Sequence, residues 1–257
     1  MELALISGTA ALASLATFFT GFGLATVLTP VMLVYFPLQT AIALTAVVHL
    51  LNNLFKYALT RHHIDWRTVL RFGAPAAIGA LLGAALLHFL PTEKIWLNYT
   101  LGSRSAAITP VKLTIGILMV FFTLFEGIPR LKELRFGENK IYLGGFISGF
   151  FGGLSGHQGA LRSAFLIRAG LTKEMFIATG IAIACIVDLT RLAVYNPVSA
   201  GLDWRAHTTT VVFATAAAFA GAVAGNLLLK KISIRAVEIF VAAGVSLLGL
   251  SLALGLL

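Results

Sequence analysis

The segment SGFFGGLSGHQGALRSAFLIRAG, residues 148–170, places His157, Gln158 and Arg162 inside an otherwise apolar run. Several glycines interrupt this run, and they predict a break in the helix at membrane depth. A helix that restarts near Gly159 would expose unpaired N–H groups and the positive end of its dipole at the break. Arg162 would lie about one turn inside that helix. A guanidinium beside a helix N-terminus is a combination that binds anions.

The first half of the chain contains a similar break, TGFG at 20–23. A helix that restarts after Gly23 would run through Thr26 and Thr29, whose hydroxyls can donate hydrogen bonds. Two helix N-termini that enter from opposite sides would meet near the midplane, where transporters built from inverted repeats bind substrate. The predicted substrate site comprises Gly23, Thr26, Thr29, His49 and Asn53 from the first half and Ser155, Gly156, His157, Gln158, Gly159 and Arg162 from the second.

Further polar side chains lie inside apolar segments. His49, Asn53 and Lys56 are spaced i, i+4 and i+7, which places them on one helical face. His49 and Asn53 are predicted either to contact substrate or to form interhelical hydrogen bonds, whereas Lys56 is predicted to extend its ammonium group to the cytoplasmic surface. Asp188 and Arg191, spaced i, i+3, are predicted to form an ion pair.

The composition indicates a membrane protein. The 257 residues are 58% hydrophobic and 11% charged, and the mean hydropathy is +0.93; a soluble domain carries about 25% charged residues. The net charge of +9 does not indicate nucleic-acid binding, because the basic residues lie in short loops between apolar runs. The single cysteine, Cys185, and the absence of histidines at metal-ligand spacing predict no metal site and no cofactor. We therefore predict an all-α polytopic membrane protein.

The apolar runs are organised as two similar halves. Eight blocks can be distinguished, at 2–36, 38–60, 67–90, 109–127, 140–169, 173–195, 206–229 and 233–256, and the first and fifth contain the glycine breaks. HHIDWRT at 62–68 recurs as AGLDWRA at 200–206. We predict two repeats, 1–127 and 140–257, each a glycine-broken helical hairpin followed by three transmembrane helices, and a cytoplasmic linker at 128–139. Asp65, Asp203 and Thr109 are predicted to be helix N-caps.

The distribution of basic residues predicts the topology. If both broken blocks return to the side they entered from, 13 lysines and arginines lie on the cytoplasmic side and 5 on the other, with Arg162 inside the membrane. If both blocks cross once, the split becomes 10 against 8. The positive-inside rule favours the hairpins, so the repeats are predicted to be inverted, with both termini on the non-cytoplasmic side.

Two glycine-rich openings, GFGLATVLTP at 21–30 and GGLSGHQGALRSAF at 152–165, are each followed by an apolar span and by an IDW or LDW element. In this order and duplication the chain resembles the sulfite exporter TauE/SafE family, also called the toluenesulfonate uptake permeases, over nearly its full length. The resemblance implies a two-repeat protein of the prokaryotic inner membrane that moves sulfur-containing anions such as sulfite and organosulfonates.

The leading hypothesis is a secondary transporter, not an enzyme, for a small sulfur-containing anion that uses alternating access around the midplane site. No nucleotide-binding motif is present, so an ion or substrate gradient is expected to drive transport, and His49 or His157 could couple a proton. A transporter or channel for another small anion stays open. An intramembrane enzyme built on Ser155, His157 and Asp188 is the weaker alternative. The direction of transport and the oligomeric state stay open.

Overall fold

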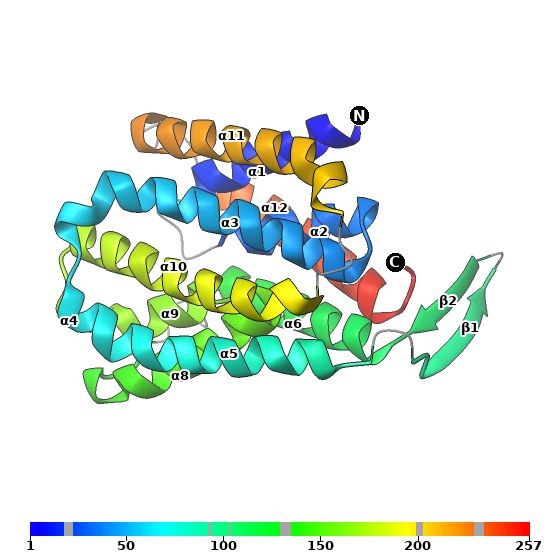
Figure 1. The fold of residues 1–257 in the computed structure, drawn as a ribbon, viewed down its shortest axis with the longest axis horizontal. Helices are drawn as coiled ribbons and strands as arrows, with labels where there is room; N and C mark the ends of the chain where they lie inside the picture. The colour runs from blue at the N-terminus through cyan, green and yellow to red at the C-terminus, as the bar shows by residue number, and fades with distance from the viewer. Residues whose placement is uncertain (18–22, 92–93, 103, 129–134, 199–202, 229–233) are drawn as a thin grey trace.

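The computed structural model describes residues 1–17, 23–91, 94–102, 104–128, 135–198, 203–228 and 234–257 (Figure 1). The first half contains α1 (Glu2–Thr17), α2 (Leu24–Tyr35), α3 (Leu38–Thr60), α4 (Trp66–Thr68), α5 (Ala74–Phe89), β1 (Leu97–Leu101), β2 (Arg104–Ile108) and α6 (Pro110–Gly127). The second half contains α8 (Ile141–Ser155), α9 (Gly159–Leu166), α10 (Lys173–Val198), α11 (Trp204–Leu228) and α12 (Ile234–Ala253). A π-helical turn at Val69–Gly73 joins α4 to α5.

Several helices have the length and apolar composition of membrane spans, which confirms the predicted class. Within the described residues, four helical segments are long and apolar enough to cross a bilayer: Leu38–His63, Trp66–Phe89, Lys173–Tyr195 and Trp204–Gly225. Shorter apolar helices accompany them, among them α2, most of α6 and α8. The chain is therefore a multi-pass helical membrane protein.

α1 and α2 run in opposite directions, and so do α8 and α9 (Figure 1). In Figure 1 the N-terminus and the connection between α2 and α3 lie at the same end of the bundle, together with β1, β2 and the C-terminus. The start of α8 and the start of α10 lie at the other end, near α4. Each broken block thus returns toward the end from which it started. The residues 18–22, which include most of the predicted TGFG break, are outside the described part of the chain.

Glycines allow helices of the two halves to approach each other closely. On α5, Gly83 lies against the backbone of Phe150 in α8, and on α8, Gly149 lies against that of Ala76, so an added Cβ at either glycine would overlap a carbonyl oxygen. On α11, Gly221 lies in the same way against Ala11 of α1. Gly83 and Gly221 both follow a DW tryptophan by seventeen residues. Hence an equivalent glycine in each half packs on the first helix of the other half, as small residues do in membrane helix pairs.

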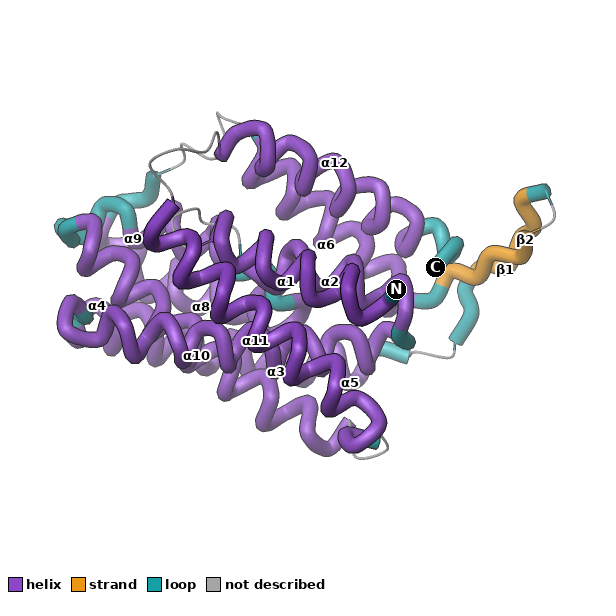
Figure 2. Tube along the Cα trace, turned by 90° about the horizontal axis from the view of Figure 1, so that it is seen from above, coloured by secondary structure: helices purple, strands orange, loops and turns teal. Residues whose placement is uncertain are grey.

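A β-hairpin corrects the all-α prediction. β1 and β2 pair antiparallel, with Leu97 opposite Ile108, and both Figures 1 and 2 show this hairpin extending beyond one end of the helices. Gly102 adopts a φ of 63°, a left-handed conformation that glycine tolerates best. The Tyr99 hydroxyl donates to the carbonyl oxygen of Leu254 at 2.7 Å and ties the hairpin to the C-terminal segment. The hairpin forms outside the apolar blocks, where hydropathy gives no information on backbone structure.

The three predicted helix N-caps are confirmed. Asp65 accepts a hydrogen bond from the backbone N–H of Arg67 at 3.2 Å, and Asp203 accepts one from that of Arg205 at 3.0 Å. Thr109 accepts from the backbone N–H of Lys112 at 3.3 Å, directly before Pro110 at the first position of α6. These caps fix the starts of α4, α11 and α6.

The close contact between α5 and α8 predicts a difference between two Gly→Ala variants. Gly149→Ala should lower the thermal stability of the purified protein by about 1–3 kcal/mol, because the new methyl group overlaps the Ala76 carbonyl. Gly8→Ala in α1 is the matched control, since nothing lies within 4 Å of a Cβ at Gly8. There alanine should stabilise the helix by up to about 1 kcal/mol. The stability of both variants can be measured by thermal unfolding in detergent. Equal melting temperatures for Gly149→Ala and Gly8→Ala would contradict the close contact between α5 and α8.

Candidate anion-binding site

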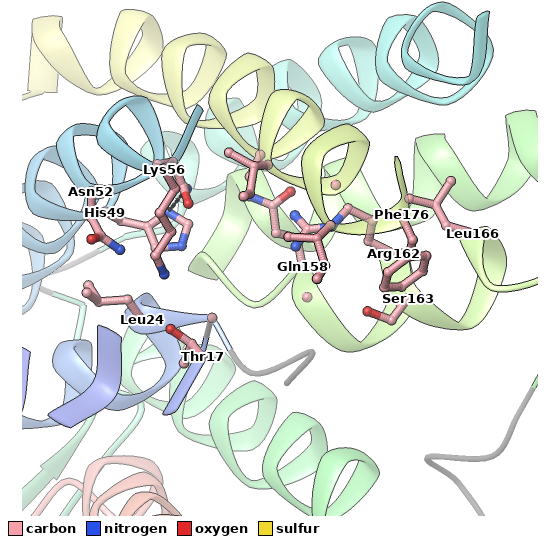
Figure 3. A pocket seen from close by; sticks show the side chains of 17 residues that line it. Thr17, Leu24, His49, Asn52, Lys56, Gln158, Arg162, Ser163, Leu166 and Phe176 are labelled. Atoms are coloured by element: carbon pink, nitrogen blue, oxygen red, sulfur yellow. Dashed lines mark hydrogen bonds between the residues drawn. The ribbon is translucent and has the colours of Figure 1, made fainter. Parts of the chain in front are cut away.

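A small cavity lies where the start of α2 and the start of α9 meet α3 and α10 (Figure 3). Its volume is about 70 Å³. The side chains come from α1 and α2 with the residue before it (Thr17, Gly23, Leu24), from α3 (His49, Asn52, Asn53, Lys56), from α9 with its N-cap (Gln158, Gly159, Arg162, Ser163, Leu166) and from α10 (Phe176, Ile177, Gly180, Ile181, Ala184). No acidic residue is among these lining residues, and two are basic.

The break between α8 and α9 places the N-terminus of α9 beside the cavity. α8 ends at Ser155, and Gly156 has φ 82° and ψ −3°, the left-handed conformation of a glycine C-cap. A Cβ on Gly156 would lie 2.7 Å from Nη1 of Arg191 and 3.3 Å from Cβ of Ala25 in α2. Both the backbone angle and the close neighbours therefore require glycine here. The Ser148 hydroxyl donates to the carbonyl oxygen of Gln158 at 3.1 Å and fixes the start of α9.

Gln158, the N-cap of α9, is buried beside the cavity without hydrogen bonds from its side chain. Its side chain is 2% exposed, and neither Oε1 nor Nε2 has a hydrogen-bond partner in the described part of the chain. An unsatisfied buried amide costs about 1–3 kcal/mol. The lining position of Gln158 therefore provides one donor and one acceptor for a polar ligand in the cavity.

Two cationic side chains line the cavity from different helices. Arg162 lies one turn into α9 and packs along α10, where a Cβ on Gly180 would be 3.4 Å from its Nε. Lys56 on α3 is 4% exposed, so the predicted extension of its ammonium to the cytoplasmic surface is wrong. The side chain turns inward because the helical face it shares with His49 and Asn53 packs on α10 and not on lipid.

A buried polar network joins α3 to α10 next to the cavity. Oδ2 of Asp188 lies 2.7 Å from Nδ1 of His49 and accepts a hydrogen bond from Nδ2 of Asn53 at 3.0 Å. Oδ1 of Asp188 lies 2.9 Å from Nη2 of Arg191, which confirms the predicted ion pair. Asp188 is 0% exposed and Arg191 is 1% exposed, so their charges compensate each other inside the protein.

The structure brings six of the eleven predicted site residues together around the cavity: Gly23, His49, Asn53, Gln158, Gly159 and Arg162. The other five do not line it. Thr26 and Thr29 are buried within α2, and Gly156 lies against Arg191.

Ser155 and His157 face each other and not the cavity. The Ser155 hydroxyl donates to the carbonyl oxygen of Phe151 at 3.1 Å. Nδ1 of His157 lies 3.0 Å from the carbonyl oxygen of Ser155, and the imidazole stacks on the ring of Phe122 with the centroids 5.7 Å apart. Asp188 binds His49, so the three residues of the enzyme hypothesis do not form a triad.

Sequence reasoning left Lys56, Asn52 and Ser163 out of the site, although all three line the cavity. The spacing of Lys56 from His49 was the available signal, since i and i+7 share a helical face. The hydroxyl of Ser14 on α1 donates to Oδ1 of Asn52 at 3.0 Å, a contact that links residues 38 positions apart. Among the described residues, no three of His, Cys, Asp or Glu gather as metal ligands.

Comparison with known proteins agrees with the membrane fold. The family model described as sulfite exporter TauE/SafE matches residues 6–252 of the 257. The chain belongs to the sulfite exporter TauE/SafE family. No curated protein matches the chain. Membership of the TauE/SafE family identifies a membrane transport protein for sulfur-containing anions in general, and it makes an enzymatic function improbable.

The ion pair of this TauE/SafE protein predicts a large loss of stability when one partner is removed. Asp188→Asn should lower the free energy of unfolding by about 3–5 kcal/mol, because the buried Arg191 loses its counterion. Asp188→Asn combined with Arg191→Gln should recover part of that loss. Glu174→Gln, which removes an exposed carboxylate at the start of α10, is the control and should change stability by less than about 0.5 kcal/mol. Equal melting temperatures for Asp188→Asn and Glu174→Gln would show that the charge of Arg191 does not depend on Asp188 for its compensation.

Proposed function

We propose that the protein is a secondary transporter that binds a small sulfur-containing oxyanion, such as sulfite or a short organosulfonate, in the cavity between α2, α3, α9 and α10. The observation that carries the proposal is the lining itself. Arg162 and Lys56 provide positive charge, Gln158 provides an unsatisfied buried amide, and no acidic residue lines the cavity in the described part of the chain.

Each lining group has a definite role toward an oxyanion. The planar guanidinium of Arg162 can donate two parallel hydrogen bonds to two anionic oxygens. The N-terminus of α9 directs backbone N–H groups and the positive end of the helix dipole toward the cavity. The amide of Gln158 donates a further hydrogen bond from Nε2, and the ammonium of Lys56 adds a compact positive charge on the α3 side.

The size of the cavity favours a small anion. The cavity of about 70 Å³ is far below the roughly 300 Å³ at which sites for drug-sized ligands begin. An inorganic oxyanion or the head group of a short sulfonate matches this space better than an aryl sulfonate does.

We propose further that transport occurs by alternating access between two inverted repeats, 1–127 and 140–257, joined by the linker 128–139. The reciprocal packing of Gly83 on α8 and Gly221 on α1 supports an equivalence of the halves. The first helix of each half begins at the opposite end of the bundle, α1 near β1 and β2 and α8 near α4, which supports the inversion (Figure 1). Rocking of the halves about a site at their interface would expose the anion to one side of the membrane at a time.

Replacement of Arg162 by glutamine should weaken sulfite binding by about tenfold to a hundredfold. The reason is that a hydrogen bond to a charged group contributes about 1.5–3 kcal/mol. The affinity can be measured on purified protein as the rise of the melting temperature with sulfite concentration, since a ligand that binds the folded state stabilises it by mass action.

Arg168→Gln is the matched control for Arg162→Gln. Arg168 follows α9 in the same hairpin, is exposed and does not line the cavity, so this variant should bind sulfite as the wild type does. Equal affinities for the two variants would remove Arg162 from the site. In proteoliposomes, unlabelled sulfite on the far side should accelerate the exit of labelled sulfite, as expected for a carrier; no acceleration would favour an anion channel.

The proposed topology predicts which positions are accessible from outside the cell. In a Cys185→Ser background, cysteines at Glu2 and Gln39 should react with a membrane-impermeant thiol reagent on intact cells. Cysteines at His63 and Asn139, which lie at the opposite end, should react only after the membrane is permeabilised. All four positions are exposed in the structure, so labelling reports sidedness. Labelling of Glu2 and Gln39 from opposite sides would show that the first block crosses once.

A further inference from the structure

His49 is the one imidazole that lines the cavity within the described residues, and its hydrogen bond fixes which ring nitrogen faces it. Nδ1 lies 2.7 Å from Oδ2 of Asp188. A carboxylate only accepts hydrogen bonds, so a contact this short requires a proton between the two atoms, held on Nδ1. Nε2 is then the nitrogen that gains or loses a proton.

Nε2 of His49 points toward the start of α2. A Cβ built on Gly23 would lie 3.7 Å from Nε2, and Gly23 both lines the cavity and is the N-cap of α2. The positive end of the α2 dipole therefore lies on the side of Nε2. His49 is 5% exposed, so bulk water does not screen these charges fully.

The charged and titratable groups around His49 come from three helices. The negative charge of Asp188 on α10 favours a protonated imidazole at His49. Three cations disfavour a positive charge there: Arg191 on α10, Lys56 on α3 and Arg162 on α9. Cys185 and Tyr195 are the other titratable groups on this part of α10, and both are buried. In α1 and α2 the titratable side chains are Glu2 and Tyr35, which lie at the far ends of those helices, and in the described part of α11 they are Arg205 and His207, near its start.

We infer that His49 is the binding site of a coupling proton, which Nε2 takes up when an anion enters the cavity. The inference rests on the proposed anion transport. In the empty cavity three cations and a helix N-terminus oppose a positive charge at Nε2. An anion in the cavity supplies negative charge on that side of the ring and accepts the hydrogen bond that Nε2–H donates. The proton comes from water and returns to water when the anion leaves, so no other bond is made or broken.

The coupling between anion binding and protonation of His49 is reciprocal, so it can be measured through either the anion affinity or the proton uptake. If the anion increases the protonation of His49, protonation increases the affinity for the anion by the same factor. One proton taken up per anion changes the affinity about tenfold per pH unit, so the affinity for an anion whose own charge is constant should fall by about a hundredfold between pH 6 and pH 8. Methanesulfonate and sulfate keep a fixed charge over this range, whereas sulfite does not, so they are the appropriate probes.

His157 is the matched control for His49. Both are buried histidines, with 2% and 5% exposure, but the ring of His157 stacks on Phe122 and does not line the cavity. Substitution of a buried histidine that only supports the fold would change the stability of the protein and nothing else. A proton site must also change the number of protons bound together with the anion.

The experiment is isothermal titration calorimetry of the full-length protein with methanesulfonate and sulfate, in buffers of different ionisation enthalpy. The wild type and His157→Gln should take up protons on binding, approaching one per anion, whereas His49→Gln should bind the anion with no proton uptake and no fall of affinity from pH 6 to pH 8. Binding to the wild type without proton uptake would overturn the proton site and leave the anion site standing. Uptake that persists in His49→Gln would also overturn it. If neither anion binds to the wild type, the anion site fails and the proton site with it.

A second measurement keeps the inference testable if His49→Gln does not fold. In wild-type protein labelled with ¹⁵N-histidine, the resonances of one ring should change from the neutral to the imidazolium pattern when methanesulfonate is added. The change should remain in His157→Gln. A change confined to the His157 resonances, or no change in any of the six histidines while the anion binds, would overturn the inference.

Discussion

The carboxylate of Asp188 is the interaction on which the centre of the protein depends. A buried charge in a membrane protein is costly unless it is paired, and Asp188 pairs with Arg191 while accepting hydrogen bonds from His49 and Asn53. These contacts join α3 of the first half to α10 of the second. Arg191 in turn lies against Gly156 at the break between α8 and α9. One carboxylate thus connects the two central helices with the element that carries Arg162.

A second constraint determines where the helices can be interrupted. In lipid, backbone groups that lack helical hydrogen bonds must be enclosed by protein or line a cavity. The segment from Gly156 to Gln158 meets this requirement because α2, α8 and α10 enclose it. Enclosure needs closely packed neighbours, and Gly83, Gly149 and Gly221 allow it by bringing helix backbones into contact. These glycines do not line the cavity, but the close helix packing they allow encloses the interrupted backbone beside it.

The sequence was sufficient for the features that depend on local patterns. The membrane class follows from hydropathy, the break near Gly156 from clustered glycines, and the N-caps at Asp65 and Asp203 from residue type and position. The Asp188–Arg191 pair follows from i, i+3 spacing. Each of these interactions is confined to neighbouring residues or to one helix turn.

The features that sequence reasoning missed depend on contacts between distant segments. His49 and Asp188 are 139 positions apart, and no local pattern indicates that they meet. The inward direction of Lys56 depends on which face of α3 packs on α10. His157 was expected in the site, but the stacking of its ring on Phe122, 35 positions away, turns it elsewhere. Periodicity gives the face of a helix, but only tertiary packing gives what that face contacts.

The two halves share a helical framework but not their polar residues. When Thr45 of α3 is aligned with Thr179 of α10, Asp188 falls opposite Leu54 and His49 opposite Ile183. α10 therefore carries the acid and α3 the histidine, and neither helix could form the network with a copy of itself. A symmetric arrangement would bury two carboxylates without a histidine donor or two imidazoles without an acceptor, both unfavourable in a medium of low dielectric constant. Because the acid and the histidine lie on different helices, the carboxylate of Asp188 accepts the hydrogen bond of the histidine in the other half. The cavity then lies between the Asp188–Arg191 pair, whose charges cancel, and the cations Arg162 and Lys56.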